Sequence, residues 1–208
     1  DGCGVKILNP AMLDFLKQKG LRTDPGRRLV FFSRPALEDA MARIPRTFEV
    51  CDREGQPVFD LGEGVSRIAA GHNAMNWVDS DTGQTRFSRV ADVERFARLC
   101  QQLEAIDLIG IPVMPQDVPD PARSLLYGVR AVIENSRKPV YFSTDNARVN
   151  GAVIRMLRAA FSGKLEEQVY GIAQFSPTSP LYWEEGVLQA IMDMAGTGVA
   201  IAVLPEPI

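Results

Sequence analysis

Polar, acidic and aromatic side chains follow several short apolar segments of this sequence, and they are its main candidates for chemistry. Carboxylates can balance a cation or move a proton, amides and hydroxyls can hydrogen-bond a ligand, and aromatic rings can contact a cation. We therefore predict eight substrate-binding residues near the ends of these segments: His72, Asn73, Trp77, Asp145, Gln174, Ser176, Tyr182 and Glu206. The pattern assigns no catalytic residue and no metal ligand.

The sequence contains a single histidine, His72. Chemistry that needs a pair of histidines is therefore excluded within this segment. A lone histidine after a strand can be a catalytic group or a hydrogen-bonded loop residue, and the sequence leaves both roles open.

Two carboxylates, Asp145 and Glu206, stand where apolar segments end. Either could face a bound cation or handle a proton. Asp145 could instead be the N-cap of the helix that follows it. Glu206 lies between two prolines, which fix its backbone, and has no helix start beside it. We therefore expect the Glu206 side chain to point into a binding site.

The aromatic residues Trp77 and Tyr182 could form a wall for an ammonium group through cation–π attraction, worth about 0.5 to 2 kcal/mol for each ring. Packing in a core explains either residue equally well.

The elements that position these residues recur about every 30 residues, around Ile109, Tyr141, Ile172 and Ile201. Their apolar runs are continuous, which is typical of buried parallel strands. These four runs predict strands at 107–111, 139–143, 169–174 and 199–204. A further strand is predicted at 66–70, where the apolar pattern is weaker. One strand, one loop and one helix per unit predict an α/β protein of the TIM (β/α)8 barrel class, with its site at the carboxyl ends of the strands.

Amphipathic patterns between these segments predict four helices. The first has Ser88 as its cap, the second starts at Asp120-Pro121, the third stops at Gly163, and the fourth runs from about Trp183 to Ala195.

Residues 1–64 lack this repeat of about 30 residues. We predict that they form an N-terminal cap and that the first part of the barrel lies at 65–208. Two short helices, after Asn9-Pro10 and after Ser33, precede a β-hairpin at 48–61. A second hairpin at 75–87 is expected over the barrel mouth.

Composition restricts the class of protein. The chain is 46% hydrophobic and 24% charged, as expected of a globular protein. It has no apolar run of about 18 residues and no signal-peptide pattern, so we expect a cytoplasmic protein. A net charge of −3 with scattered Lys and Arg gives no sign of nucleic-acid binding. The three cysteines lack metal spacing and are interpreted as reduced thiols.

Several nucleotide, hydrolase and metal motifs are absent. The sequence has no Walker A loop, GxGxxG, GxSxG, HExxH or EF-hand pattern. Five strands of an eight-stranded barrel would leave two sheet edges open. We therefore expect a fragment of a longer protein rather than one completed by other copies of itself, and we also expect the protein to be a homo-oligomer.

Six short segments in this order resemble the trimethylamine methyltransferase (MttB-like) family: Ile44-Pro-Arg-Thr-Phe48, Asp79-Ser-Asp-Thr-Gly83 followed by Arg86, Asp92-Val-Glu-Arg-Phe-Ala-Arg-Leu99, Pro112-Val-Met-Pro-Gln-Asp-Val118, Ser176-Pro-Thr-Ser-Pro-Leu181 and Val203-Leu-Pro-Glu-Pro-Ile208. The resemblance runs from about Gly4 to the last residue. It implies a TIM barrel that moves a methyl group from a tertiary or quaternary amine to the Co(I) of a separate corrinoid protein.

The resemblance also implies which part of the reaction this chain performs and which part its partner performs. Cobalamin would be carried by the corrinoid partner, with no cofactor bound by this chain, and the protein would mainly orient and desolvate the amine. Family members that use trimethylamine carry pyrrolysine and others use betaine-type substrates, but the deciding position lies beyond Ile208. Two alternatives remain: a degenerate or truncated paralogue that only docks a corrinoid protein, and a barrel enzyme of another class.

Overall fold

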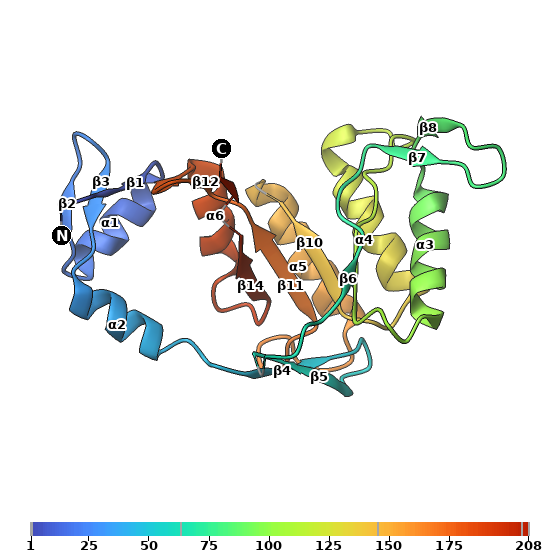
Figure 1. The fold of residues 1–208 in the computed structure, drawn as a ribbon, viewed down its shortest axis with the longest axis horizontal. Helices are drawn as coiled ribbons and strands as arrows, with labels where there is room; N and C mark the ends of the chain where they lie inside the picture. Colours follow the sequence, from blue (N-terminus) through green and yellow to red (C-terminus); the bar gives the residue numbers. More distant parts are fainter. Residues whose placement is uncertain (1, 63, 145, 205, 208) are drawn as a thin grey trace.

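The computed structural model describes residues 2–62, 64–144, 146–204 and 206–207, with backbone only at 147, 206 and 207 (Figure 1). The described helices are α1 (Pro10–Gln18), α2 (Arg34–Ala42), α3 (Val90–Gln102), the 3-10 helix η1 (Pro121–Arg123), α4 (Ser124–Asn135), α5 (Ala147–Ala160) and α6 (Glu185–Met194).

The central element is a parallel sheet of five strands in the order β14-β11-β10-β9-β6. Its strands are β6 (Ala69–Ala70), β9 (Leu108–Gly110), β10 (Val140–Ser143), β11 (Gly171–Phe175) and β14 (Ala200–Val203). The sequence predicted these five strands, their parallel direction and their neighbours, and the structure confirms all three. All five strands are shorter than predicted, above all β6 with its two residues.

The sheet is open in the described residues, with β6 and β14 at its two edges. The structure therefore confirms an α/β protein with a parallel sheet, whereas the closed TIM barrel stays a prediction.

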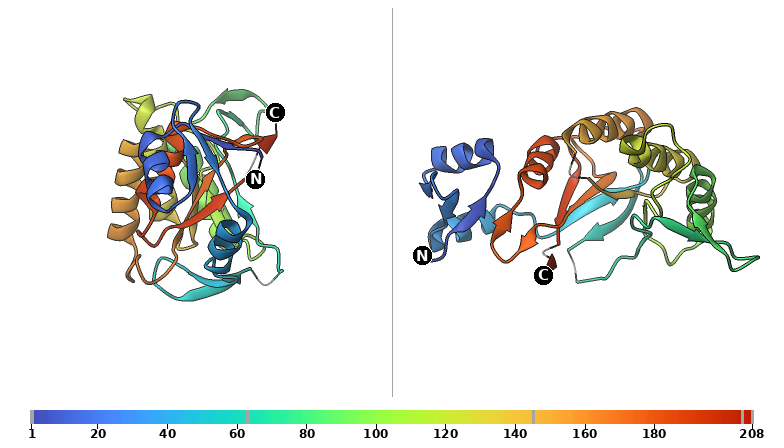
Figure 2. Two further views of the ribbon diagram at one scale, coloured as in Figure 1. Left: turned by 90° about the vertical axis from the view of Figure 1, so that its left-hand side faces the viewer. Right: turned by 90° about the horizontal axis from the view of Figure 1, so that it is seen from above.

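Helices α3 to α6 cover one face of this sheet, which we call the outer face (Figure 2). Ile109, Val140 and Phe142 point from the strands into the same core as the apolar stripes of these helices. The opposite, inner face carries Tyr141, Ser143, Ile172, Gln174 and the small residues of β14. Because successive strand residues alternate between faces, one short strand serves both the core and the site.

The hairpin β4 (Phe48–Cys51) and β5 (Pro57–Leu61) forms a sheet of its own, as predicted. Val50 and Phe59 pack against Leu108 and Ile172 at the amino-terminal end of the inner face. The second predicted hairpin, β7 (Asn76–Val78) with β8 (Thr85–Phe87), is also present and lies at the end of the molecule far from α1 and α2 (Figure 1).

The N-terminal unit, residues 2–46, contains β1 (Val5–Ile7), β2 (Arg22–Asp24), β3 (Leu29–Phe31) and the two short helices α1 and α2. Strand β1 pairs in parallel with β13 (Tyr182–Trp183), a contact that the sequence did not predict. The remaining two strands, β12 (Thr178–Ser179) and β15 (Glu206–Pro207), pair with each other. The division of the chain near residue 64 stays a prediction.

Three predicted helix ends were wrong. Helix α3 has Arg89 as its N-cap, because the buried Ser88 hydroxyl instead lies 2.7 Å from the carbonyl oxygen of Met114. Trp183 belongs to β13 rather than to α6. Helix α5 ends at Ala160, before Gly163.

Among the described residues, no helix is long and apolar enough to cross a lipid bilayer.

Candidate functional site

The turn after β6 lies against β9 at the carboxyl end of the sheet because two glycines permit it. A Cβ at Gly110 would overlap the carbonyl oxygen of Gly71, and a Cβ at Gly71 would come within 2.7 Å of Pro112 Cα. Gly71 also has a positive φ of 83°, which favours glycine. The two glycines therefore bring the next residues of the turn over the inner face.

Asn73 is the residue that this turn places in the site. Its backbone amide donates to the carbonyl oxygen of Ile111 at 2.6 Å, and its φ of 49° is in the left-handed region that asparagine tolerates. Its side-chain amide nitrogen donates to the Ser143 hydroxyl at 2.8 Å. Its side-chain oxygen is buried and has no hydrogen-bond partner in the described part of the chain, so Asn73 retains a free acceptor.

Tyr141 and Gln174 form the second polar group of the site. The Tyr141 hydroxyl donates to Gln174 Oε1, and Gln174 Nε2 donates to the Ser176 hydroxyl at 3.2 Å. Ser143 is the register partner of Gln174 on the neighbouring strand. Burial raises the pKa of the Tyr141 phenol above its ordinary value, so the phenol stays protonated and can donate.

His72 lies at the rim of this group. Its side chain is exposed, and its ring centroid lies 5.9 Å from that of Tyr141 at an interplanar angle of 49°. The structure therefore brings together four of the eight predicted residues, His72, Asn73, Gln174 and Ser176, on or beside the inner face. We call these four residues with Tyr141 and Ser143 the polar mouth.

Two predicted aromatic residues are not part of the polar mouth. Trp77 lies in β7 and packs, half-buried, against the main core. Tyr182 lies in β13, beside the N-terminal unit, with Lys6 Nζ 5.8 Å from its ring centroid.

Asp145 lies outside the described residues, and the helix cap proposed for it as an alternative is provided by Asn146, which accepts from Arg148 and Val149. For Glu206 only the backbone is described: it starts β15 and is the register partner of Thr178 in β12.

The hairpin β7–β8 is attached to α3 by an ion pair. Arg86 donates to both carboxylate oxygens of the buried Asp92, each at 2.7 Å. These hydrogen bonds hold the pKa of Asp92 below its ordinary value. Asp92 also accepts from the backbone amide of Arg89, so one carboxylate stabilises both the helix start and the hairpin.

Comparison of the sequence with known proteins identifies the family to which the chain belongs. The family described as "Trimethylamine methyltransferase (MTTB)" matches residues 1–207. The chain belongs to this family. It is 25% identical over 205 residues to trimethylamine methyltransferase MttB of Desulfitobacterium hafniense, and the match covers 97% of this chain and 41% of that protein. It is 24% identical over 208 residues to MttB1 of Methanosarcina acetivorans, with 97% of this chain and 42% of that protein covered. The chain thus spans about two fifths of the length of these relatives.

Within this MttB-family chain, sequence reasoning missed Tyr141 and treated Ser143 only as a residue near a strand end. The signal was present in β10, where buried Val140 and Phe142 alternate with Tyr141 and Ser143. Reading this segment as a continuous apolar run concealed the alternation.

No cluster of three or more His, Cys, Asp or Glu side chains that could hold a metal ion occurs among the described residues. Cys3, Cys51 and Cys100 are free thiols, and burial is the main cause that raises the pKa of the latter two.

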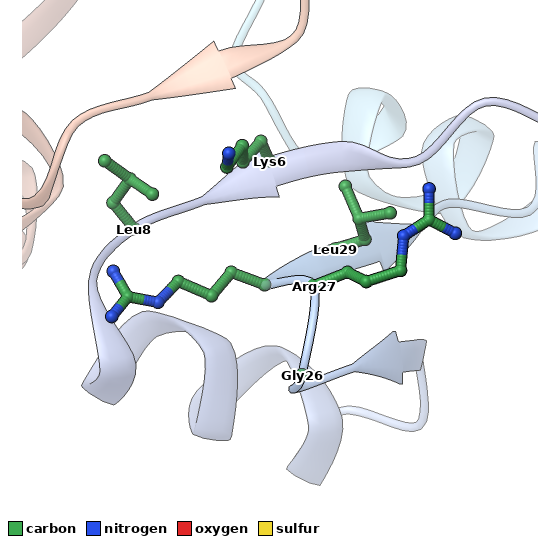
Figure 3. A pocket seen from close by; sticks show the side chains of 6 residues that line it. Lys6, Leu8, Gly26, Arg27 and Leu29 are labelled. Carbon is green, nitrogen blue, oxygen red and sulfur yellow. The ribbon is translucent and has the colours of Figure 1, made fainter.

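A separate hollow of about 570 Å³ lies on the N-terminal unit (Figure 3). Lys6, Arg27 and Arg28 line it together with Leu8 and Leu29, and none of these three cations forms an ion pair in the described residues. None of the residues of the polar mouth lines this hollow.

Proposed function

We propose that the full-length protein transfers a methyl group from a tertiary or quaternary amine to the Co(I) of a corrinoid protein. The observation that carries this proposal is the polar mouth at the carboxyl end of a parallel sheet, in a chain that belongs to the trimethylamine methyltransferase family over residues 1–207. In α/β folds, this end of the sheet is where ligands bind.

The polar mouth supplies groups suited to holding an amine. The ring of Tyr141 can contact an ammonium group by cation–π attraction, worth about 0.5 to 2 kcal/mol. The free Asn73 side-chain oxygen can accept a hydrogen bond from a protonated tertiary amine, whereas a quaternary ammonium has no N–H to donate. The Ser143 and Ser176 hydroxyls can donate to a polar substituent of a betaine-type substrate.

The reduced corrinoid of the partner would supply the nucleophile, so we assign no acid, base or nucleophile to this chain. The work left for its residues is to bind the amine, orient one methyl group toward the partner and exclude water. Ala200 and Ala202 of β14 leave space on the inner face in which an amine could lie. We expect no cobalamin site in this chain.

The full-length protein is also proposed to close the sheet into a TIM barrel. The strand edges β6 and β14 offer backbone donors and acceptors that further strands would pair. The expected cytoplasmic location and the homo-oligomer remain proposals.

The test is methyl transfer by the full-length protein with its corrinoid protein, reduced cobalt and either trimethylamine or glycine betaine. We expect methyl-cobalt absorbance to appear with one of these amines. Equal transfer with S-adenosylmethionine and no cobalt would indicate another barrel enzyme. Binding of the corrinoid protein without turnover would indicate a paralogue that only docks it.

A further inference from the structure

A groove of about 640 Å³ separates the N-terminal unit from β14 and α6. Among the described residues, those that line it include no charged one: Ile191, Ile201 and Val203 form part of one wall, and Val5, Phe32 and Leu37 form part of the other. Helix α1 contacts α6, so the two walls are joined at one end (Figure 2). An apolar surface of this size needs a cover in water.

The outer face of β14 is exposed where its neighbours are buried. Ala173 and Phe175 of β11 are 0% and 3% exposed, but their register partners Ile201 and Val203 are 39% and 43% exposed. β14 lies at the edge of the sheet, whereas β11 has a neighbouring strand on each side. The two strands run in the same direction, and Ile201 and Val203 of β14 line the same groove as Ile191 of α6. The uncovered surface is therefore the continuation of the helix-covered face.

The order of elements indicates what covers such a face. A helix follows each of the four earlier strands, and α3 to α6 all lie on the outer face. A strand followed by a helix and a parallel neighbour gives a right-handed crossover, which returns the helix to this same face. The relatives are more than twice as long as this chain, so proteins of this length have enough residues to form a further strand and helix.

We propose that the groove receives one amphipathic helix formed by the residues that follow β14 in the full-length protein. Its apolar stripe would contact Ile201 and Val203 on one side and Phe32 and Leu37 on the other. The N-terminal unit thereby acts as a clamp that holds this helix against the sheet. This explains why α2 has no buried residue although Leu37 lies on its apolar side. The proposal does not depend on the activity.

The test is photo-cross-linking of the full-length protein that carries Leu37→p-benzoylphenylalanine, with peptides identified by mass spectrometry. One βα unit takes about 30 residues. We therefore expect a cross-link within one chain to a peptide in the first 30 or so residues after Ile208. Phe87→p-benzoylphenylalanine is the control, because Phe87 is 73% exposed on β8 and lies outside the groove.

Cross-links between two chains would assign the groove to a second copy and overturn the proposal, as would a cross-link elsewhere in the chain or none at all. A second measurement uses Val203→Glu and the control Val78→Glu on the exposed hairpin. We expect the first change to lower the Tm by at least about 5 °C and the second by less than about 1 °C. Equal shifts would contradict a covered groove.

Discussion

Asn73 and Ser143 are hydrogen-bonded at 2.8 Å although one residue follows β6 and the other ends β10, with β9 between them. The contact is possible because Gly110 leaves room on the inner face of β9. It ties three strands together at the place where the proposed substrate binds.

The first prediction concerns the Asn73 side chain. Asn73→Gly removes the amide and keeps the positive φ, so the backbone of the turn is preserved. We expect kcat/KM for the amine to fall about tenfold, or about 1.4 kcal/mol, because Ser143 and the substrate each lose a partner. Asn73→Ala should also lower the stability by about 1 kcal/mol, because alanine is strained at this φ. Unchanged kinetics in the glycine variant would remove Asn73 from the site.

The second prediction concerns Gly110. A methyl group in Gly110→Ala would overlap the Gly71 carbonyl, so we expect β6 to move away from β9. The free energy of unfolding should fall by about 1 to 3 kcal/mol, with loss of amine binding. Gly151→Ala is the matched control: Gly151 lies inside α5, a Cβ there would come no closer than 3.4 Å to the flexible Arg155 side chain, and alanine should stabilise by about 0.5 to 1 kcal/mol. Chemical denaturation of both variants measures the difference, and equal stabilities would show that the turn has room to adjust.

The strands could be predicted from the sequence because most of them are short apolar segments, and the signal is strongest in β9 and β11, which are buried on both faces. Val140 and Ile172 belong to short apolar runs bounded by loops, and the repeat spacing gives their parallel order. The pairing of β1 with β13 could not be predicted, because Lys6 and Tyr182 are far apart in the chain and each strand has only two or three residues.

The candidate site was predicted in part. His72 and Asn73 could be predicted because they directly follow a strand. The directions in which the Trp77 and Tyr182 side chains point could not be predicted in this way. Tyr182 was expected near the mouth, and tertiary pairing with the N-terminal unit determines its place instead. A single residue of displacement in a turn changes which side chain enters a site, and sequence periodicity does not resolve turns.

The third prediction concerns Tyr141. Tyr141→Phe removes the donor to Gln174 Oε1, and we expect kcat/KM to fall about three- to tenfold. Because burial raises the Tyr141 pKa, the phenol should stay protonated below about pH 10, and the alkaline limb of the pH–rate profile should be the same in both proteins. Tyr127→Phe on α4 is the control and should leave kcat/KM unchanged. A shifted alkaline limb in Tyr141→Phe would mean that this phenol titrates during turnover.

The fourth prediction concerns Arg86 and Asp92. Arg86→Met leaves the buried Asp92 without its cation, and the full-length protein should lose roughly 3 kcal/mol of stability. The pKa of folded Asp92 is lowered, so its contribution is present above the unfolded value near 4 and is lost as pH falls through the folded value. The variant should therefore lose less stability than the natural protein between about pH 5 and pH 2.

Arg130→Met is the control for this pair, because Arg130 and Glu134 form an exposed ion pair on α4 at 2.8 Å. Such pairs contribute about 0.3 to 0.5 kcal/mol. Urea unfolding at several pH values compares the variants, and a loss for Arg86→Met as small as that for Arg130→Met would show that Asp92 is hydrated after the change.

The last prediction concerns Glu206, whose backbone pairs with Thr178 next to the loop that contains Ser176. A carboxylate near the polar mouth could balance the charge of an ammonium substrate, and none of the six residues that form the mouth carries a carboxylate. Glu206→Gln in the full-length protein should raise the KM for the amine roughly ten- to a hundredfold, equal to about 1.4 to 2.8 kcal/mol of binding, with little change in folding. Glu185→Gln, at an exposed position in the first turn of α6, removes the same charge and should leave the KM unchanged. Steady-state kinetics of both variants decide the matter: an unaltered KM in Glu206→Gln, or an equal rise in both variants, would assign Glu206 a role outside the binding site.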